Sequence, residues 1–133
     1  RSWRVLMHHV FQIPVAFLDM EEKGQALTYE TMILPPPENL TTSADIADFG
    51  EVVRECFKAW WKEAEGKDFS DEVPTYFGST SRHEMLERTV WHSTQHVRQV
   101  HSLLEQAGVV PIQPLTREDI QGLPLTEKIW DEA

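Results

Sequence analysis

The sequence predicts an all-α protein, a helical bundle in a single domain that covers residues 1–133. Three observations favour this class. Apolar residues recur at spacings of three and four in three long segments, the pattern of helices with one buried face. Capping residues precede two of these segments, and glycines follow them. A chain of 133 residues can also bury one core without disulfides. We find no internal repeat and no second domain.

The first predicted helix covers residues 2–22, and its apolar stripe is Trp3, Leu6, Val10, Ile13 and Phe17. Pro14 lies inside this pattern, so we expect a kink near Val10 rather than an end of the helix. Of the two adjacent histidines, His9 falls at the edge of the stripe and His8 falls on the polar side. His9 is therefore predicted to point inward, with His8 as its competitor.

A long connection is predicted for residues 21–42, because it contains Gly24 and three consecutive prolines. We expect an extended or short helical piece in it that can wall a pocket. The second long helix should begin after a cap at Thr42 or Ser43 and end near Glu65. Its predicted buried stripe is Ile46, Phe49, Val53, Phe57 and Trp60. The single cysteine, Cys56, is expected to be buried on this helix, and one cysteine excludes an intramolecular disulfide.

Residues 67–80 read as a polar connection, and the third long helix follows it. Ser81 and Glu84 have the spacing of a capping box at the start of this helix. Gly108 is expected to end it. Beyond it, we expect an extended stretch over residues 109–114 and one or two short helices within residues 116–131.

The charge balance argues against nucleic acid and anionic lipid as partners. There are 12 Lys and Arg against 22 Asp and Glu, a net charge of −10, which repels phosphate groups. No apolar run has the length of a membrane span, and the first residues do not form a signal peptide. We therefore expect a cytoplasmic protein that does not bind a membrane.

His92 and His96 lie four residues apart in the third helix, so both imidazoles project from one face. That face also carries Met85 and is predicted to point inward. Neutral imidazole binds zinc, nickel, copper and iron, and His9 supplies a third inward ring if the first and third helices are neighbours. Three nitrogens with a free fourth position are typical of a catalytic metal site. Core histidines bonded to other polar groups are the competing interpretation.

Other polar residues on this helix are further candidates for the metal site. Gln99 lies one turn beyond His96 and either holds a ligand ring or makes an ordinary hydrogen bond between helices. Glu84 and Glu87 have the chemistry of an acid or base, but capping and solvation are the better interpretations. His83 and His101 are expected on the surface.

An early histidine on an amphipathic helix, followed by His92-x-x-x-His96-x-x-Gln99, resembles the DinB/YfiT-like superfamily. The resemblance implies a four-helix bundle, often dimeric, that binds a divalent metal through such a triad. It also implies a metal-dependent hydrolase or a thiol-dependent transferase or isomerase. Two features depart from the family pattern. Val97-Arg98 replaces Arg-Gly, and the first helix of the family is missing, so that N-terminal residues are absent or another subunit covers the exposed face.

We therefore expect a DinB-like metalloprotein that holds zinc or nickel on His9, His92 and His96 with one coordination position open. Its expected partners are a small-molecule substrate, for which a low-molecular-weight thiol is one candidate, and a second copy in a homodimer. A non-catalytic metal-binding or stress-response bundle is the alternative. A helical interaction module without metal is the third interpretation.

Overall fold

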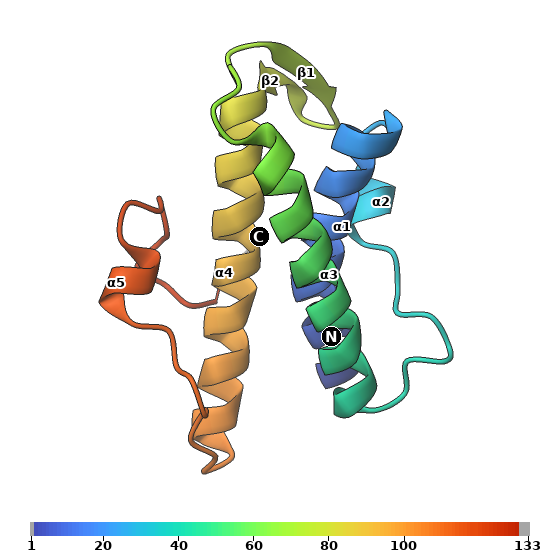
Figure 1. The fold of residues 1–133 in the computed structure, drawn as a ribbon. Coiled ribbons are helices and arrows are strands. Elements are labelled where there is room, and N and C mark those ends of the chain that lie inside the picture. The colour runs from blue at the N-terminus through green and yellow to red at the C-terminus, as the bar shows by residue number, and fades with distance from the viewer. Residues whose placement is uncertain (1, 131–133) are drawn as a thin grey trace.

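Three long helices form most of the computed structural model, which describes residues 2–130 (Figure 1). They are α1 (Trp3–Lys23), α3 (Ser43–Ala64) and α4 (Arg82–Gln106). Two short helices follow the expected pattern: α2 (Tyr29–Met32) lies in the connection of residues 21–42, where an extended or short helical piece is predicted, and α5 (Arg117–Ile120) lies within residues 116–131, where one or two short helices are predicted. The expectation of a mainly helical protein is confirmed.

The prediction of an all-α protein is wrong in one segment. Residues 67–80, expected to be a polar connection, contain strand β1 (Glu72–Thr75), which pairs antiparallel with β2 (Gly78–Ser81). Each strand has only four residues, and Val73 is the one buried residue among them. An alternation of period two cannot be recognised over so short a stretch, and Pro74 further weakens the strand pattern.

Helix α1 is the central element of the fold, since it packs against both α3 and α4. In Figure 1 it runs behind α3, with α4 to the left, and the hairpin lies at one end of the bundle. Phe17 is fully buried, and its ring lies against those of Phe57 and Trp60. The core cluster comprises Ile13, Ala16, Phe17, Leu18, Leu27, Met32, Trp60, Ala64, Val73 and Met85.

The helix starts follow the predicted caps. The Thr42 side chain accepts a hydrogen bond from the Asp45 backbone N–H, and the Asp45 carboxylate accepts one from the Thr42 backbone N–H, which completes a capping box. Ser81 likewise accepts from the Glu84 backbone N–H. The Glu84 carboxylate instead accepts a hydrogen bond from the Thr80 hydroxyl. The capping box predicted at this helix is therefore half formed.

His8 does not lie on an exposed polar face, contrary to the helical-wheel prediction. It is 2% exposed and stacks on Phe49, with 5.2 Å between ring centroids. Helix α2 and the connection after it cover this side of α1: Gln12 Nε2 donates to the Thr31 carbonyl at 2.9 Å, and Arg4 Nε donates to the Leu40 carbonyl at 2.6 Å. Burial, with a smaller contribution from Arg4, lowers the pKa of His8.

Cys56 is exposed, so the prediction that it is buried is wrong. Helix α3 packs mainly against α1 and buries a narrow stripe of Ile46, Gly50, Val53, Trp60 and Ala64. An apolar groove of about 400 Å³ remains beside this stripe, with Val10, Val53 and Val90 among its lining residues. None of the helices formed within residues 2–130 has the length and apolarity needed to cross a membrane.

Candidate metal centre

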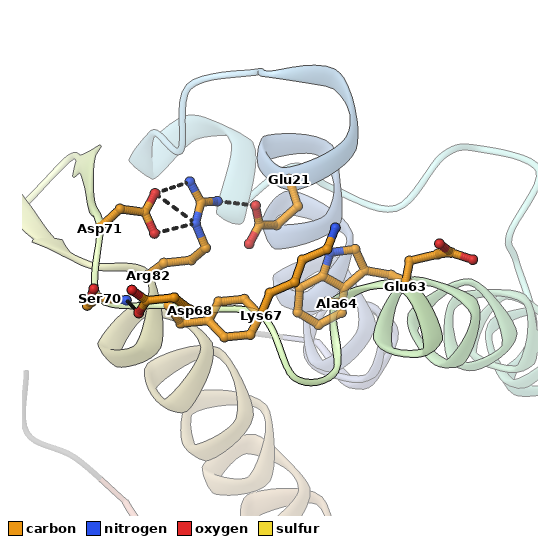
Figure 2. A pocket seen from close by; sticks show the side chains of 10 residues that line it. Glu21, Glu63, Ala64, Lys67, Asp68, Ser70, Asp71 and Arg82 are labelled. Atoms are coloured by element: carbon orange, nitrogen blue, oxygen red, sulfur yellow. Dashed lines mark hydrogen bonds and ion pairs between the residues drawn. The ribbon is translucent and has the colours of Figure 1, made fainter.

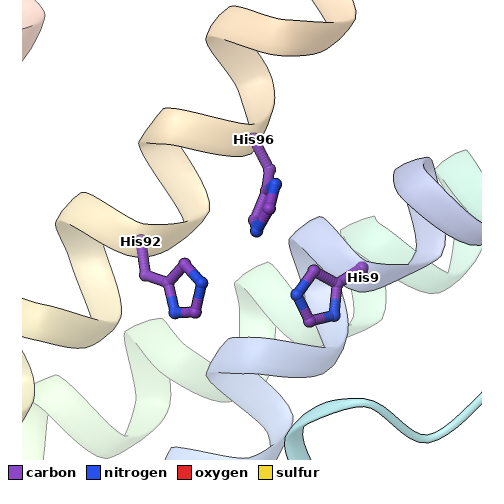
Figure 3. A group of neighbouring side chains, drawn as sticks. All are labelled: His9, His92 and His96. Atoms are coloured by element: carbon purple, nitrogen blue, oxygen red, sulfur yellow. The ribbon is translucent and has the colours of Figure 1, made fainter. Parts of the chain in front are cut away.

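His9 on α1 and His92 and His96 on α4 come together between the two helices (Figure 3). One nitrogen of each ring lies within 4.8 Å of the others. The ring centroid of His9 is 5.9 Å from that of His92 and 4.6 Å from that of His96, and the last two are 5.0 Å apart. The predicted meeting of these three residues is confirmed, whereas their binding of a metal stays a prediction.

The three imidazoles fit a metal ion in donor type and spacing. Nitrogens bound to a tetrahedral ion at about 2.0–2.1 Å stand roughly 3.4 Å apart. A spread of up to 4.8 Å therefore needs only small rotations of the side chains. His9 is 7% exposed, whereas His92 and His96 are half-buried, so the centre can be approached along α4.

A hydrogen bond beside the three histidines connects α1 to α4. Pro14 has no N–H, so the Val10 carbonyl, four residues earlier, lacks its helical donor. The Ser93 hydroxyl donates to this carbonyl at 2.8 Å. Val10 follows His9 and Ser93 follows His92, so this bond helps to align the two helices where the imidazoles meet.

Replacing Ser93 by alanine is expected to lower the free energy of unfolding by about 1–2 kcal/mol, because a partly buried carbonyl loses its donor. Urea unfolding measures the change. Ser102→Ala on the same helix is the matched control, since the side-chain hydrogen bond of Ser102 found among residues 2–130 comes from Gln106 of its own helix. An equal effect of the two substitutions would contradict the assigned role of Ser93.

The hydrogen bonds of Gln99 set the tautomer of His96. Gln99 Nε2 donates to the Ile129 carbonyl at 3.1 Å, so its Oε1 faces His96. His96 Nδ1 lies 2.8 Å from this oxygen and must therefore donate its proton to it. Nε2 of His96 then carries the lone pair that a metal requires. Gln99 thus makes both contacts that the sequence left open: one to a histidine ring and one to a distant segment.

Two residues that the sequence analysis did not select hold the segment that contains Ile129. Gln95 Nε2 donates to the carbonyls of Lys128 and Ile129 at 3.1 and 2.6 Å. Arg98 Nη1 donates to Gln95 Oε1 at 2.7 Å and to the Thr126 carbonyl at 2.8 Å. Arg98, which departs from the family pattern, therefore fastens the C-terminal segment to α4. Because the acceptors are backbone carbonyls, no sequence motif marks these contacts.

The remaining candidates lie apart from this centre. Glu84 lies about two turns before His92 and Glu87 about one turn before it, and both are exposed. His83, near the start of α4, is exposed as well. His101 is half-buried one turn after His96. The Trp91 ring lies 5.6 Å from that of His92 between centroids. Within residues 2–130, no carboxylate or thiol joins the three imidazoles in a ligand group.

Comparison with protein-family models, with curated proteins and with solved structures finds no match to this chain. The resemblance to the DinB/YfiT-like superfamily therefore stays a prediction. The interpretation of the site depends on the geometry of the three imidazoles and their neighbours.

Proposed function

We propose that this chain is a metalloprotein that binds one divalent ion, zinc or nickel, through His9, His92 and His96. The observation that carries the proposal is the convergence of three imidazoles from two helices, with ligand atoms within 4.8 Å of one another. Imidazole is a preferred ligand of both metals, and three such ligands leave a coordination position open. The hydrogen bond from His96 to Gln99 supports the proposal because it presents Nε2 for coordination.

The reaction that we propose is metal-dependent hydrolysis or thiol-dependent transfer, as the resemblance to the DinB/YfiT-like superfamily suggests. A divalent ion would supply a Lewis acid that lowers the pKa of a water or thiol. The chain itself contributes the fixed orientation of His96 and access past the half-buried His92. In a non-catalytic metal-binding or stress-response bundle, the same site would only store or sense the ion.

Cobalt substitution tests the proposal and separates its two forms. The purified protein is first analysed for metal content and then loaded with Co²⁺, whose absorption spectrum reports coordination number and ligands. We expect one Co²⁺ per chain and a thiolate-to-cobalt absorption band when a small thiol is added. A spectrum that neither a thiol nor a small anion changes would favour the non-catalytic bundle. Absence of stoichiometric binding would overturn the metal site.

Replacing Gln99 by leucine is expected to weaken metal binding by about 10–100-fold, since His96 loses the acceptor that fixes its ring and tautomer. Competition of the protein with a chelator of known zinc affinity measures the change. Gln106→Leu is the control, because Gln106 is exposed at the end of the same helix. Equal metal affinity of the Gln99 and Gln106 variants would show that Gln99 does not support the centre.

We propose a homodimer, in agreement with the resemblance. The apolar groove lined by Val10, Val53 and Val90 supports this assembly, because it is a surface that a second copy could cover. The lining surface of the groove is almost entirely apolar, although Arg54 and Lys58 are among the residues that line it. Burial of such a surface is favourable in proportion to its apolar area.

A further inference from the structure

A second cavity, of about 570 Å³, lies away from the histidines (Figure 2). It is formed where the ends of α1 and α3 meet the segment of residues 67–71 and the start of α4. Glu21 on α1 lines it, 12 residues after His9, which is about 18 Å along a helix. The cavity is therefore separate from the candidate metal centre, and the inference drawn from it does not depend on the proposed function.

The buried carboxylate of Glu21 is only half satisfied. Its side chain is 8% exposed, and Oε2 accepts a hydrogen bond from Arg82. The other oxygen, Oε1, is buried and has no hydrogen-bond partner among residues 2–130. Figure 2 shows that the Glu21 carboxylate extends from α1 toward the other residues that line the cavity, with Arg82 bound to one of its two oxygens. An unpaired buried carboxylate oxygen is costly, so this atom marks a position where a donor would bind.

The charges around Glu21 favour a cation as that donor. Arg82 is already engaged by the Asp71 carboxylate through Nε and Nη2 and by Glu21 through Nη1. Burial disfavours the ionised form of Glu21 and raises its pKa in spite of the Arg82 guanidinium, so Arg82 does not fully compensate the charge of this carboxylate. Hydrogen bonds from Ser70 lower the pKa of Asp68, another carboxylate of the lining, which therefore stays ionised. The lining therefore has more carboxylates than cations: Glu21, Glu63, Asp68 and Asp71 against Lys67 and Arg82.

Two aromatic rings form an apolar part of the lining. The centroids of Trp60 and Phe69 are 6.2 Å apart, and their planes are inclined by 57°. Aromatic faces attract organic cations and also bury the methylene groups attached to them. Hard divalent ions need six or more oxygen ligands, or several retained waters. Within residues 2–130, however, only the three histidines form a group of potential ligands around one point.

We propose that this cavity binds a small organic ammonium ion. Its N–H group donates to Glu21 Oε1, and its methylene groups lie against Trp60 and Phe69. The ion supplies the donor that the buried carboxylate of Glu21 lacks. Because this hydrogen bond is charge-assisted, the site should select a cation over a neutral molecule of the same shape.

Titration with n-butylammonium chloride, followed by the amide and indole resonances of ¹⁵N-labelled protein, tests this proposal. We expect saturable shifts of the Trp60 indole and of residues 67–71, with a dissociation constant in the millimolar range, about what a ligand of five heavy atoms reaches. n-Butanol and butanoate, which match its shape, should not saturate the site. Glu21→Gln should weaken binding by about tenfold or more, because a charge-assisted hydrogen bond is lost. Glu63→Gln, another carboxylate of the lining, should have a smaller effect.

Three results would overturn the proposal. The first is the absence of shifts at Trp60, and the second is equal binding of n-butanol. The third is a folded Glu21→Gln variant that binds n-butylammonium as well as the original chain does. The comparison of ammonium with alcohol uses the unmodified protein, so it holds even if the variant does not fold. Metal content should be unchanged in Glu21→Gln, which separates this site from the histidine centre.

Discussion

Replacing His9 by alanine is expected to abolish stoichiometric zinc or nickel binding. His9 is the one ligand that α1 contributes, and α4 supplies only the pair His92 and His96. Two imidazoles hold an ion far more weakly than three, and the site would no longer connect the two helices. A metal present at about 1,000 times its dissociation constant stabilises the folded chain by about 4 kcal/mol. For a domain of this size, that corresponds to a rise of roughly 10–15 °C in Tm, which the variant should not show.

Metal analysis after dialysis and thermal unfolding with and without added metal measure the two effects. His83→Ala is the matched control, since His83 is exposed on α4 and lies outside the group of three. That variant should keep one ion per chain and the full rise in Tm. A His9 variant that still binds one ion per chain would exclude the three-histidine centre.

The sequence was sufficient for the long helices and for the meeting of the histidines. Apolar spacing and caps such as Thr42 are local signals, and they act within a few residues of the element that they define. Spacing of four residues also placed His92 and His96 on one face without knowledge of the fold. His9 required only the additional assumption that the first and third helices are neighbours, which the packing of α1 on α4 confirms.

His8 shows why a helical wheel fails for a central helix. A helical wheel assigns one buried face to a helix, but α1 is covered by α3, by α4 and by the connection that binds Gln12 and Arg4. A central helix buries polar residues as well, provided that other segments supply their hydrogen bonds. The wheel therefore correctly predicted that His9 points toward His92 and His96, but it wrongly placed His8 on the polar side.

Hydrogen bonds between segments that are distant in the sequence could not be predicted for a related reason. Pro14 reveals that the Val10 carbonyl needs a donor, but nothing in the sequence identifies Ser93, 83 positions away, as that donor. Gln99 is bound to a backbone carbonyl at Ile129, and every residue offers such a group. Glu21 lies near the end of a helix, and nothing in the sequence identifies Arg82, 61 positions away, as its partner.

Replacing Arg82 by methionine is expected to destabilise the fold by about 3 kcal/mol at neutral pH, the lower end of what an unpaired buried charge costs. Arg82 is 25% exposed and connects α4 to the end of α1, and without it both oxygens of Glu21 lack a donor. Methionine keeps most of the length of the side chain, so lost packing contributes little. Asp71→Asn is the control, because Asp71 is 54% exposed and its loss leaves Glu21 paired. That variant should show only a small part of the change.

The pH dependence distinguishes a buried charge from a general loss of packing. Burial already raises the pKa of Glu21 above its ordinary value of 4.5, and removal of Arg82 raises it further. A carboxyl group whose pKa is raised in the folded state binds its proton more tightly there than in the unfolded chain. Stability therefore falls as the pH rises through the folded pKa, and the fall extends to higher pH in the variant. Urea unfolding should show a small deficit at about pH 5 and the full deficit at about pH 8. An equal deficit at both pH values would mean that the ionised Glu21 is not the cause.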